Sequence, residues 1–298
     1  MTQPSRMACV QDACYLLSGG VGALGLVTTQ MMMEEGAKSL VLMSRRGVIS
    51  PDMQAHWEQL QKFSIELQVK ACDVGSLDSL QMMLSDLRKG LAATSPAVQI
   101  KGLIHLAAVL DDATLPKLTR SHLERAFGAK VWGARHLHAA LASPIKPLDF
   151  IVLFSSTSAL LGSPGQANYS AANATLDAAA NFWQQAGDKA WSVQWGPWRE
   201  VGMAAQKGTV ERLKAQGLGS IGNVVGMAVL CGSLGATSSV IAACPVHWGP
   251  YLRQFGGAVP QFYARFKKEA GAGQAVASQQ DSAVAVSPEQ VEQLVLSV

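Results

Sequence analysis

The stretch CYLLSGGVGALG, residues 14–25, decides the fold of this 298-residue chain. A short apolar strand leads into glycines, and a helix follows. Gly20, Gly22 and Gly25 fit the pattern G-x-G-x-x-G, in which glycines permit a tight turn and a close approach of the backbone to a pyrophosphate. The alternative is an ordinary strand-to-helix turn. The residues expected to bind a dinucleotide cofactor here are Ser18, Gly20, Gly22, Leu24 and Gly25.

Strand-like and helix-like segments alternate along the rest of the chain. This alternation predicts an α/β fold, a Rossmann-like doubly wound parallel sheet with helices on both faces. Strands are expected at 13–17, 39–43, 65–69, 100–106, 150–154, 191–195 and 239–242. Helices are expected at 23–35, from 51 onward, and at 76–90, 120–141, 169–185 and 210–216.

The end of the second predicted strand indicates which dinucleotide is bound. An acidic residue at this point would bind the ribose 2′-hydroxyl of NAD, but the sequence here is Ser44-Arg45-Arg46. A guanidinium matches phosphate oxygens in a bidentate way, so these residues favour the 2′-phosphate of NADPH. A solvated basic loop is the alternative interpretation.

Composition excludes several classes of protein. Apolar residues make up 49% of the chain and the net charge is only +3, so a nucleic-acid partner is not expected. No apolar run approaches the roughly 20 residues that cross a bilayer, and no signal peptide begins the chain, so no membrane partner is expected. The five cysteines are scattered and form no metal motif. We therefore expect a cytoplasmic protein without a metal site.

A second cluster of polar residues indicates reduction of a carbonyl group. Tyr169 and Asn173 are one helical turn apart, Ser155 and Ser156 end the fifth strand, and Lys130 lies further upstream. A tyrosine can protonate a carbonyl oxygen when a nearby lysine lowers its pKa of about 10. A serine hydroxyl can hold the same oxygen, although a polar turn after a buried strand would also explain the serines.

The placement of the lysine is unusual and points to a family. Most short-chain dehydrogenases have lysine four residues after the tyrosine, where this chain has Asn173. The exchange, with Lys130 on an earlier helix, resembles the ketoreductase domains of modular polyketide synthases, and the resemblance extends from about Cys14 to about Phe255. It implies NADPH-dependent reduction of a β-ketoacyl thioester, presented on the phosphopantetheine arm of an acyl carrier protein among other synthase domains.

The resemblance also implies a role for each residue. Tyr169 would donate the proton and Ser156, whose spacing to Tyr169 matches the family, would orient the carbonyl. Lys130 would lower the pKa of Tyr169, and Asn173 would position Lys130 or a water. After the third strand, Asp73 and Val74 would contact the adenine, although Asp73 could equally cap the next helix.

Further residues are expected to contact the substrate. Leu110-Asp111-Asp112 resembles the Leu-Asp-Asp signature of B-type ketoreductases, which form a D-configured β-hydroxyl, although a capped turn would also explain it. Pro164 resembles the B2 subtype, which reduces an epimerised α-methyl substrate. Trp198 and Met203 belong to a glycine-bounded insertion that suits a mobile lid, with an ordinary surface helix as the alternative.

The sequence divides into two regions. Residues 1–269 form the predicted ketoreductase catalytic (NADPH-binding) domain, reached without the structural subdomain that usually precedes it in synthases. Residues 270–298 form a predicted flexible linker and the start of a possible carrier domain, with a helix-like run from Ser287 to Val298. Two rival functions remain, a free-standing short-chain reductase of small ketones and a non-catalytic NADPH-binding scaffold.

Overall fold

The computed structural model describes residues 9–10, 12–94, 97–141, 147–202, 209–256, 258–268 and 295–297. Within these residues, eight strands form one sheet in the order β3-β2-β1-β4-β5-β6-β7-β8. Neighbouring strands from β3 to β7 are parallel, and β8 is antiparallel to β7. The strands are β1 (Ala13–Ser18), β2 (Ser39–Ser44), β3 (Glu66–Ala71), β4 (Gln99–His105), β5 (Phe150–Ser156), β6 (Ala190–Trp195), β7 (Val240–Ala243) and β8 (Val295–Ser297).

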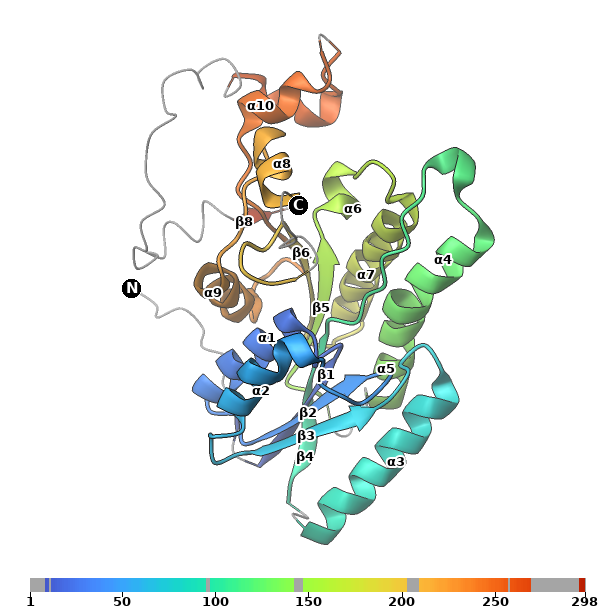
Figure 1. The fold of residues 1–298 in the computed structure, drawn as a ribbon, viewed down its shortest axis with the longest axis vertical. Helices are drawn as coiled ribbons and strands as arrows, with labels where there is room; N and C mark the ends of the chain where they lie inside the picture. The colour runs from blue at the N-terminus through green and yellow to red at the C-terminus, as the bar shows by residue number, and fades with distance from the viewer. Residues whose placement is uncertain are drawn as a thin grey trace.

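Helices cover both faces of this sheet, as the sequence predicts. Helices α1, α2 and α9 lie on one side, and α3, α4, α5 and α7 lie on the other (Figure 1). The helices are α1 (Ala23–Glu34), α2 (Gln54–Leu60), α3 (Leu77–Thr94), α4 (Arg120–Phe127), α5 (Gly133–Leu141), α6 (Ser158–Leu161), α7 (Ala167–Gln185), α8 (Thr209–Ala215), α9 (Asn223–Ser233) and α10 (Trp248–Arg253). No helix in the described ranges is long and apolar enough to cross a membrane.

Each face of the sheet packs its own hydrophobic core. Strand β1 is buried along its whole length, with Tyr15 and Leu17 facing α1 and Cys14 and Leu16 facing the α3, α5 and α7 layer. Burial on both faces explains why this strand is an unbroken apolar run rather than an alternating one. The strand order reverses direction between β1 and β4, and in open α/β sheets ligands bind at the carboxyl ends of such strands.

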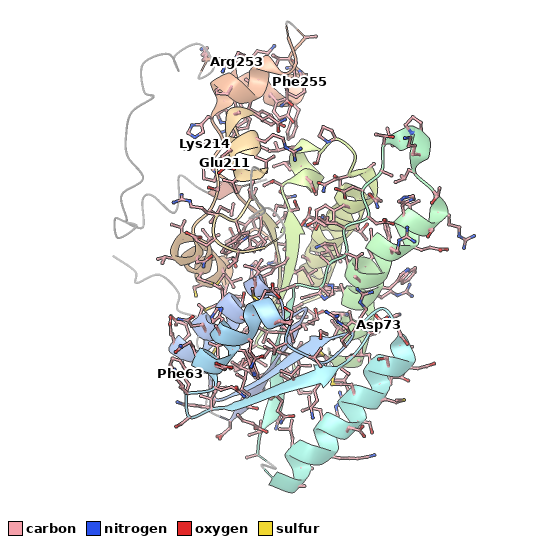
Figure 2. The ribbon with its side chains drawn as sticks, viewed as in Figure 1. Phe63, Asp73, Glu211, Lys214, Arg253 and Phe255 are labelled. Atoms are coloured by element: carbon pink, nitrogen blue, oxygen red, sulfur yellow. The ribbon has the colours of Figure 1, made fainter. Side chains whose placement is uncertain are left out.

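Above these carboxyl ends lie α8 and α10, which Figure 1 shows at the top of the molecule. Figure 2 marks Glu211 and Lys214 on α8, with Arg253 on α10 and Phe255 just after it. A small aromatic core holds this part together, in which Trp248 stacks on Phe266 with ring centroids 3.8 Å apart.

The structure adds elements that the sequence does not predict and corrects one. Helix α9 fills part of the stretch that we interpreted as an insertion with a single helix, because its apolar residues bury against β6 and β7. Helices α6 and α10 are also new. At the end of the chain, Val295–Ser297 pair with β7 as a strand, so the helix-like run predicted there is wrong at these residues.

Candidate active site

The glycine loop after β1 is shaped by close backbone contacts. Gly19 has φ +72°, and a Cβ there would lie 2.8 Å from the backbone nitrogen of Ala107. A Cβ on Gly25 would lie 2.4 Å from the carbonyl oxygen of Gly20, so α1 packs directly against the loop. Gly22 is the N-cap of α1 and caps it with no side chain. The N–H groups of the first helical turn are therefore available to a phosphate, and the loop fits a dinucleotide.

One large cavity opens beside this loop, with a volume of about 730 Å³. Gly22, Leu24 and Gly25 line one side of it, and Lys130, Ser156 and Tyr169 line another. Asp112, Pro164 and Trp198 complete the set of predicted site residues that line it. The structure thus brings together the glycine loop, the carbonyl-reducing residues and part of the predicted substrate site.

Other predicted cofactor residues lie around the cavity rather than in its wall. Ser18 is fully buried beneath the loop, and Gly20 packs on Leu17. Ser44 forms a turn in which its carbonyl and hydroxyl oxygens both accept the N–H of Gly47. The side chains of Arg45 and Arg46 are exposed at the end of β2.

In the segment after β3, Asp73 does not cap the next helix, and its contact with the adenine stays a prediction. Figure 2 marks Asp73 at the end of this strand. Its carboxylate accepts the N–H of Gly75 at 3.0 Å, which makes a local turn. Ser76 caps α3 instead, because its hydroxyl accepts the N–H of Ser79 at 3.3 Å. Val74 is buried against Gly133 of α5.

The two serines at the end of β5 point to different places. The hydroxyl of Ser155 donates to the carbonyl of Asn173 at 3.3 Å and is buried against α7. The hydroxyl of Ser156 accepts the N–H of Ser158 at 3.1 Å and is only half-buried, at the cavity wall. A hydroxyl that accepts one bond and keeps its hydrogen free can donate to a carbonyl oxygen, so the geometry favours Ser156 for that task.

Lys130 lies on an irregular helical turn. Gly128–Trp132 form a π-helical turn between α4 and α5, a widening that is frequent at functional sites. The side chain is 2% exposed, its ammonium donates to the carbonyl of Phe154 at 2.8 Å, and it lies 5.3 Å from the ring centroid of Tyr169. Burial lowers the pKa of Lys130 to about 7, and the charge of Asp177 opposes this fall.

The net shift in the pKa of Tyr169 is upward in this structure, and the lowering effect of Lys130 stays a prediction. Burial raises the pKa of the Tyr169 phenol, while the neighbouring side chains of Asn173 and Ser156 oppose the rise. The phenol is buried, and the cost of burying a phenolate exceeds the help that its neighbours give. Tyr169 is therefore held as the neutral, proton-bearing form.

Asn173 forms a hydrogen bond within its own helix. Its side-chain N–H donates to the backbone carbonyl of Tyr169 at 2.9 Å, and the side-chain oxygen has no hydrogen-bond partner among the described residues. The ammonium of Lys130 is held by Phe154 instead. Asn173 thus braces the helical turn that carries Tyr169 and makes no hydrogen bond to Lys130, and its predicted role in positioning a water stays a prediction.

The segment that resembles a stereochemical signature is tied to the start of α7. Asp111 forms an ion pair with Arg125, and its carbonyl accepts the side-chain N–H of Asn168 at 2.9 Å. Asp112 accepts the side-chain N–H of Gln166 at 2.9 Å. These contacts explain the Asp-Asp pair structurally, and they leave Asp112 in the wall of the cavity.

The far wall of the cavity comes from the segment after β6. Trp198 is buried, lies 5.0 Å from the ring of Trp195 and packs against Gly226 of α9. Leu213 of α8 and Leu218 also line the cavity, which places α8 over the site. Met203 lies outside the described residues.

Two polar residues, buried His105 and half-buried Asp177, escaped the sequence prediction. His105 ends β4, with Nδ1 2.5 Å from the hydroxyl of Ser18 and Nε2 2.9 Å from the carbonyl of Lys130. Asp177 lies two helical turns after Tyr169 on α7. Signals existed for both, because His105 ends a central strand and Asp177 continues the four-residue spacing of Tyr169 and Asn173.

Comparisons with known proteins identify the family of this chain. The model of the KR domain family matches residues 13–200. The 6-methylsalicylic acid synthase of Arthrobotrys oligospora is 36% identical over 220 residues, which cover 70% of this chain and 12% of that protein. Polyketide synthase GfsA of Streptomyces halstedii is 34% identical over 254 residues, 85% of this chain and 3% of that protein.

Similar solved structures are also ketoreductases of polyketide synthases. A structure of A-type ketoreductases from a modular polyketide synthase has a TM-score of 0.78 and 32% identity, covering 91% of this chain and 55% of that one. The first ketoreductase of the tylosin synthase has a TM-score of 0.70 and 34% identity, covering 90% and 56%. This chain spans a small fraction of the curated relatives, which are multidomain synthases. Because the family model covers more than half of it, the chain belongs to the KR domain family, the ketoreductase domains of polyketide synthases.

Proposed function

We propose that this domain reduces a β-ketoacyl thioester to a D-β-hydroxyacyl thioester during polyketide synthesis, with NADPH as the reductant. The observation that carries the proposal is that Tyr169, Ser156 and Lys130 line the same cavity as the glycine loop. Domains of this family bind nicotinamide cofactors, and the loop described above fits the phosphates of one. A carbonyl group in this cavity would meet a hydrogen-bond donor and a proton donor at once.

Each residue has a distinct task in the proposed reaction. Ser156 donates a hydrogen bond to the carbonyl oxygen of the substrate, and this fixes the oxygen beside Tyr169. Tyr169, which burial keeps protonated, gives its proton to that oxygen as the carbonyl carbon receives a hydride. When bound, NADPH would supply that hydride. Lys130 then returns a proton to the phenolate, and its lowered pKa of about 7 suits that transfer.

The preference for NADPH is supported by charge at the end of β2. Arg45 and Arg46 are exposed there, and this strand end carries no carboxylate in the sequence. A ribose 2′-phosphate carries a charge that these guanidinium groups can pair with, whereas a 2′-hydroxyl does not.

The D configuration is supported by the Leu110-Asp111-Asp112 segment. Leu110 and Asp112 line the cavity, where they can select the side from which the acyl chain enters. The similar solved structure reported above is titled A-type, so overall similarity does not distinguish the types and this segment carries the assignment. Pro164 also lines the cavity, and its likeness to the B2 subtype supports reduction of an epimerised α-methyl substrate.

The proposed partners are an acyl carrier protein, whose phosphopantetheine arm presents the β-ketoacyl chain, and the other domains of a synthase. Relatives of this chain are parts of such synthases, which supports a synthase over a free-standing reductase of small ketones. A non-catalytic scaffold would not need Tyr169, Ser156 and Lys130 around one cavity. We propose a cytoplasmic location on the same grounds.

One experiment separates these functions. The purified protein is mixed with NADPH and a β-ketoacyl N-acetylcysteamine thioester, and NADPH absorbance is followed. A polyketide ketoreductase consumes NADPH with this thioester faster than with small ketones such as cyclohexanone. The reverse order indicates a free-standing reductase, and NADPH binding without turnover of either substrate indicates a scaffold.

A further inference from the structure

We propose that Asp177 is a positioning residue of this reductase, the half-buried carboxylate that supplies a counter-charge to the ammonium of Lys130 from behind Tyr169. This inference rests on the proposed function. The carboxylate of Asp177 does not line the cavity and so does not touch substrate or cofactor. Asp177 therefore acts on the reaction only through its effect on Lys130.

The first support is the helix face that α7 turns to the sheet. Tyr169, Asn173 and Asp177 follow one another at intervals of four residues, so they lie one above the other on one face of α7. Buried Ala172, Leu176 and Ala180 pack beside them against the sheet. An acidic residue on such a face is costly unless it is paired.

The second support is the set of hydrogen bonds that fixes the carboxylate. The hydroxyl of Ser192 donates to one oxygen at 2.6 Å, and the side-chain N–H of Gln194 donates to the other at 2.8 Å. Both donors come from β6, and they are the alternate residues that face α7. The carboxylate is therefore held by strand β6, and its position does not depend on the lysine.

The third support is the register of β5 and β6. Ser155 is the partner of Gln194 and Phe154 is the partner of Val193, so the anchor of Lys130 lies level with the donors to Asp177. Helices α5 and α7 pack in the same core on this face of the sheet. Hence the lysine docked on the Phe154 carbonyl and the carboxylate docked on β6 lie at the same level of neighbouring strands, and the carboxylate acts on the ammonium across that gap without a direct ion pair.

The groups packed around Lys130 leave Asp177 as its counter-charge. Strand β4 contributes His105, whose own pKa is lowered to about 3 by burial and by the charge of Lys130. The loop before α4 contributes Asp112, which acts on Tyr169. Strands β5 and β6 contribute no charged side chain. On α7 the titratable groups are Tyr169 and Asp177.

Lys130 and Asp177 have reciprocal effects on each other's pKa. Burial lowers the pKa of Lys130, and Asp177 is the group that raises it. Burial in turn raises the pKa of Asp177, and Lys130 is among the groups that lower it, after Ser192, Gln194 and Ser155. Each charge therefore favours the ionised form of the other.

The test compares Asp177→Asn with Asp188→Asn, which removes a carboxylate paired with His138 just beyond the C-terminal end of α7. The pH dependence of kcat/KM is measured with NADPH and the N-acetylcysteamine thioester. In Asp177→Asn the loss of rate at high pH should begin about one pH unit or more lower than in the wild type, because a nearby opposite charge shifts a pKa by about 1–3 units. In Asp188→Asn the fall of kcat/KM at high pH should begin at the same pH as in the wild type. In Asp177→Glu it should begin close to the wild-type pH.

A second measurement does not depend on activity. NMR titration of protein carrying ¹³Cε-labelled lysine follows Lys130, assigned by its absence in Lys130→Met. The titration of Lys130 should move to lower pH in Asp177→Asn, and an unchanged titration in this folded variant overturns the inference even if no thioester is reduced. Failure of the wild type to reduce the thioester overturns the proposed function alone. Should Asp177→Asn not fold, Asp177→Ser, uncharged and still able to accept from Gln194, carries the same test.

Discussion

The imidazole Nε2 of His105 lies 2.9 Å from the backbone carbonyl of Lys130 and joins β4 to the π-helical turn. Burial lowers the pKa of His105 to about 3, so the ring is neutral. A carbonyl only accepts, so Nε2 carries the hydrogen and donates, and Nδ1 of the neutral ring therefore accepts from the hydroxyl of Ser18. The backbone of Lys130 is thereby fixed to the strand that precedes the glycine loop.

Replacing Tyr169 by phenylalanine removes the proposed proton donor and keeps the ring. General acid catalysis contributes about 10²–10⁴-fold, so kcat should fall by at least about 100-fold. The cofactor loop is untouched, and the dissociation constant for NADPH, measured by fluorescence titration, should change little. Most of the activity surviving in the variant would rule out the assignment of Tyr169.

Replacing Lys130 by methionine should change how stability depends on pH. The pKa of Lys130 is lowered by burial from 10.5 to about 7, so between these values the unfolded state binds more protons than the folded state. The free energy of unfolding contributed by this group therefore rises with pH across that window.

The melting temperature of the methionine variant relative to the wild type should be highest near pH 7 and fall toward pH 10. Each kcal/mol moves Tm by about 2–4 °C in a domain of this size. Differential scanning fluorimetry at several pH values measures the trend, and a constant difference would mean that Lys130 is not perturbed. The same variant should lose turnover, since it cannot return a proton to Tyr169.

Alanine should lower the free energy of unfolding at one glycine of the cofactor loop and change it little at another. In Gly25→Ala the new Cβ meets the carbonyl of Gly20 at 2.4 Å, so backbone must move, and we expect a loss of about 1–3 kcal/mol in unfolding free energy. Gly22→Ala is the matched control, because its Cβ meets only the carbonyl of Gly19 at 3.6 Å and its φ of −78° suits alanine. Urea denaturation compares the two, and equal stabilities would contradict the packing described here.

Replacing Arg45 and Arg46 together by alanine should narrow the preference for NADPH over NADH. A hydrogen bond to a charged group contributes about 1.5–3 kcal/mol, so the ratio of kcat/KM values should fall at least about tenfold. Arg88→Ala on α3 serves as a control for loss of a surface arginine. A wild type that uses both cofactors equally would show that the arginines serve another purpose.

The configuration of the product tests the Leu110-Asp111-Asp112 segment. We expect the reduced diketide thioester to be predominantly the D-hydroxy isomer on chiral chromatography. A predominantly L product would contradict the B-type assignment and leave the reductase assignment standing.

Local sequence patterns predicted the parts of this structure that local interactions determine. The strand, glycine loop and helix from Ala13 to Glu34 were placed within about one residue, because turn chemistry and apolar spacing specify them. Helix α9 was missed because Asn223–Ser233 is apolar on most sides and shows no helical stripe.

The sequence predicted which residues line the cavity better than it predicted their contacts and burial. Tyr169, Ser156 and Lys130 meet at one cavity as expected, since each lies at or near the carboxyl edge of the sheet. The raised pKa of Tyr169 and the inward turn of Asn173 depend on burial and on partners from distant segments, which sequence spacing does not reveal. His105 and Asp177 were missed for the same reason.

The bonds between the Asp111–Ala113 loop and residues 165–168 have a practical consequence for chimeric synthases. Asn168 and Gln166 hold this loop through side chains, and the N–H of Ala113 donates to the carbonyl of Gly165 at 2.9 Å. A loop grafted alone from a ketoreductase that forms the opposite product configuration would lack the residues at 165–168 that bind it. Such a graft would misplace the start of the helix that carries Tyr169. Engineers who want to invert an alcohol centre should therefore transplant both segments as one cassette.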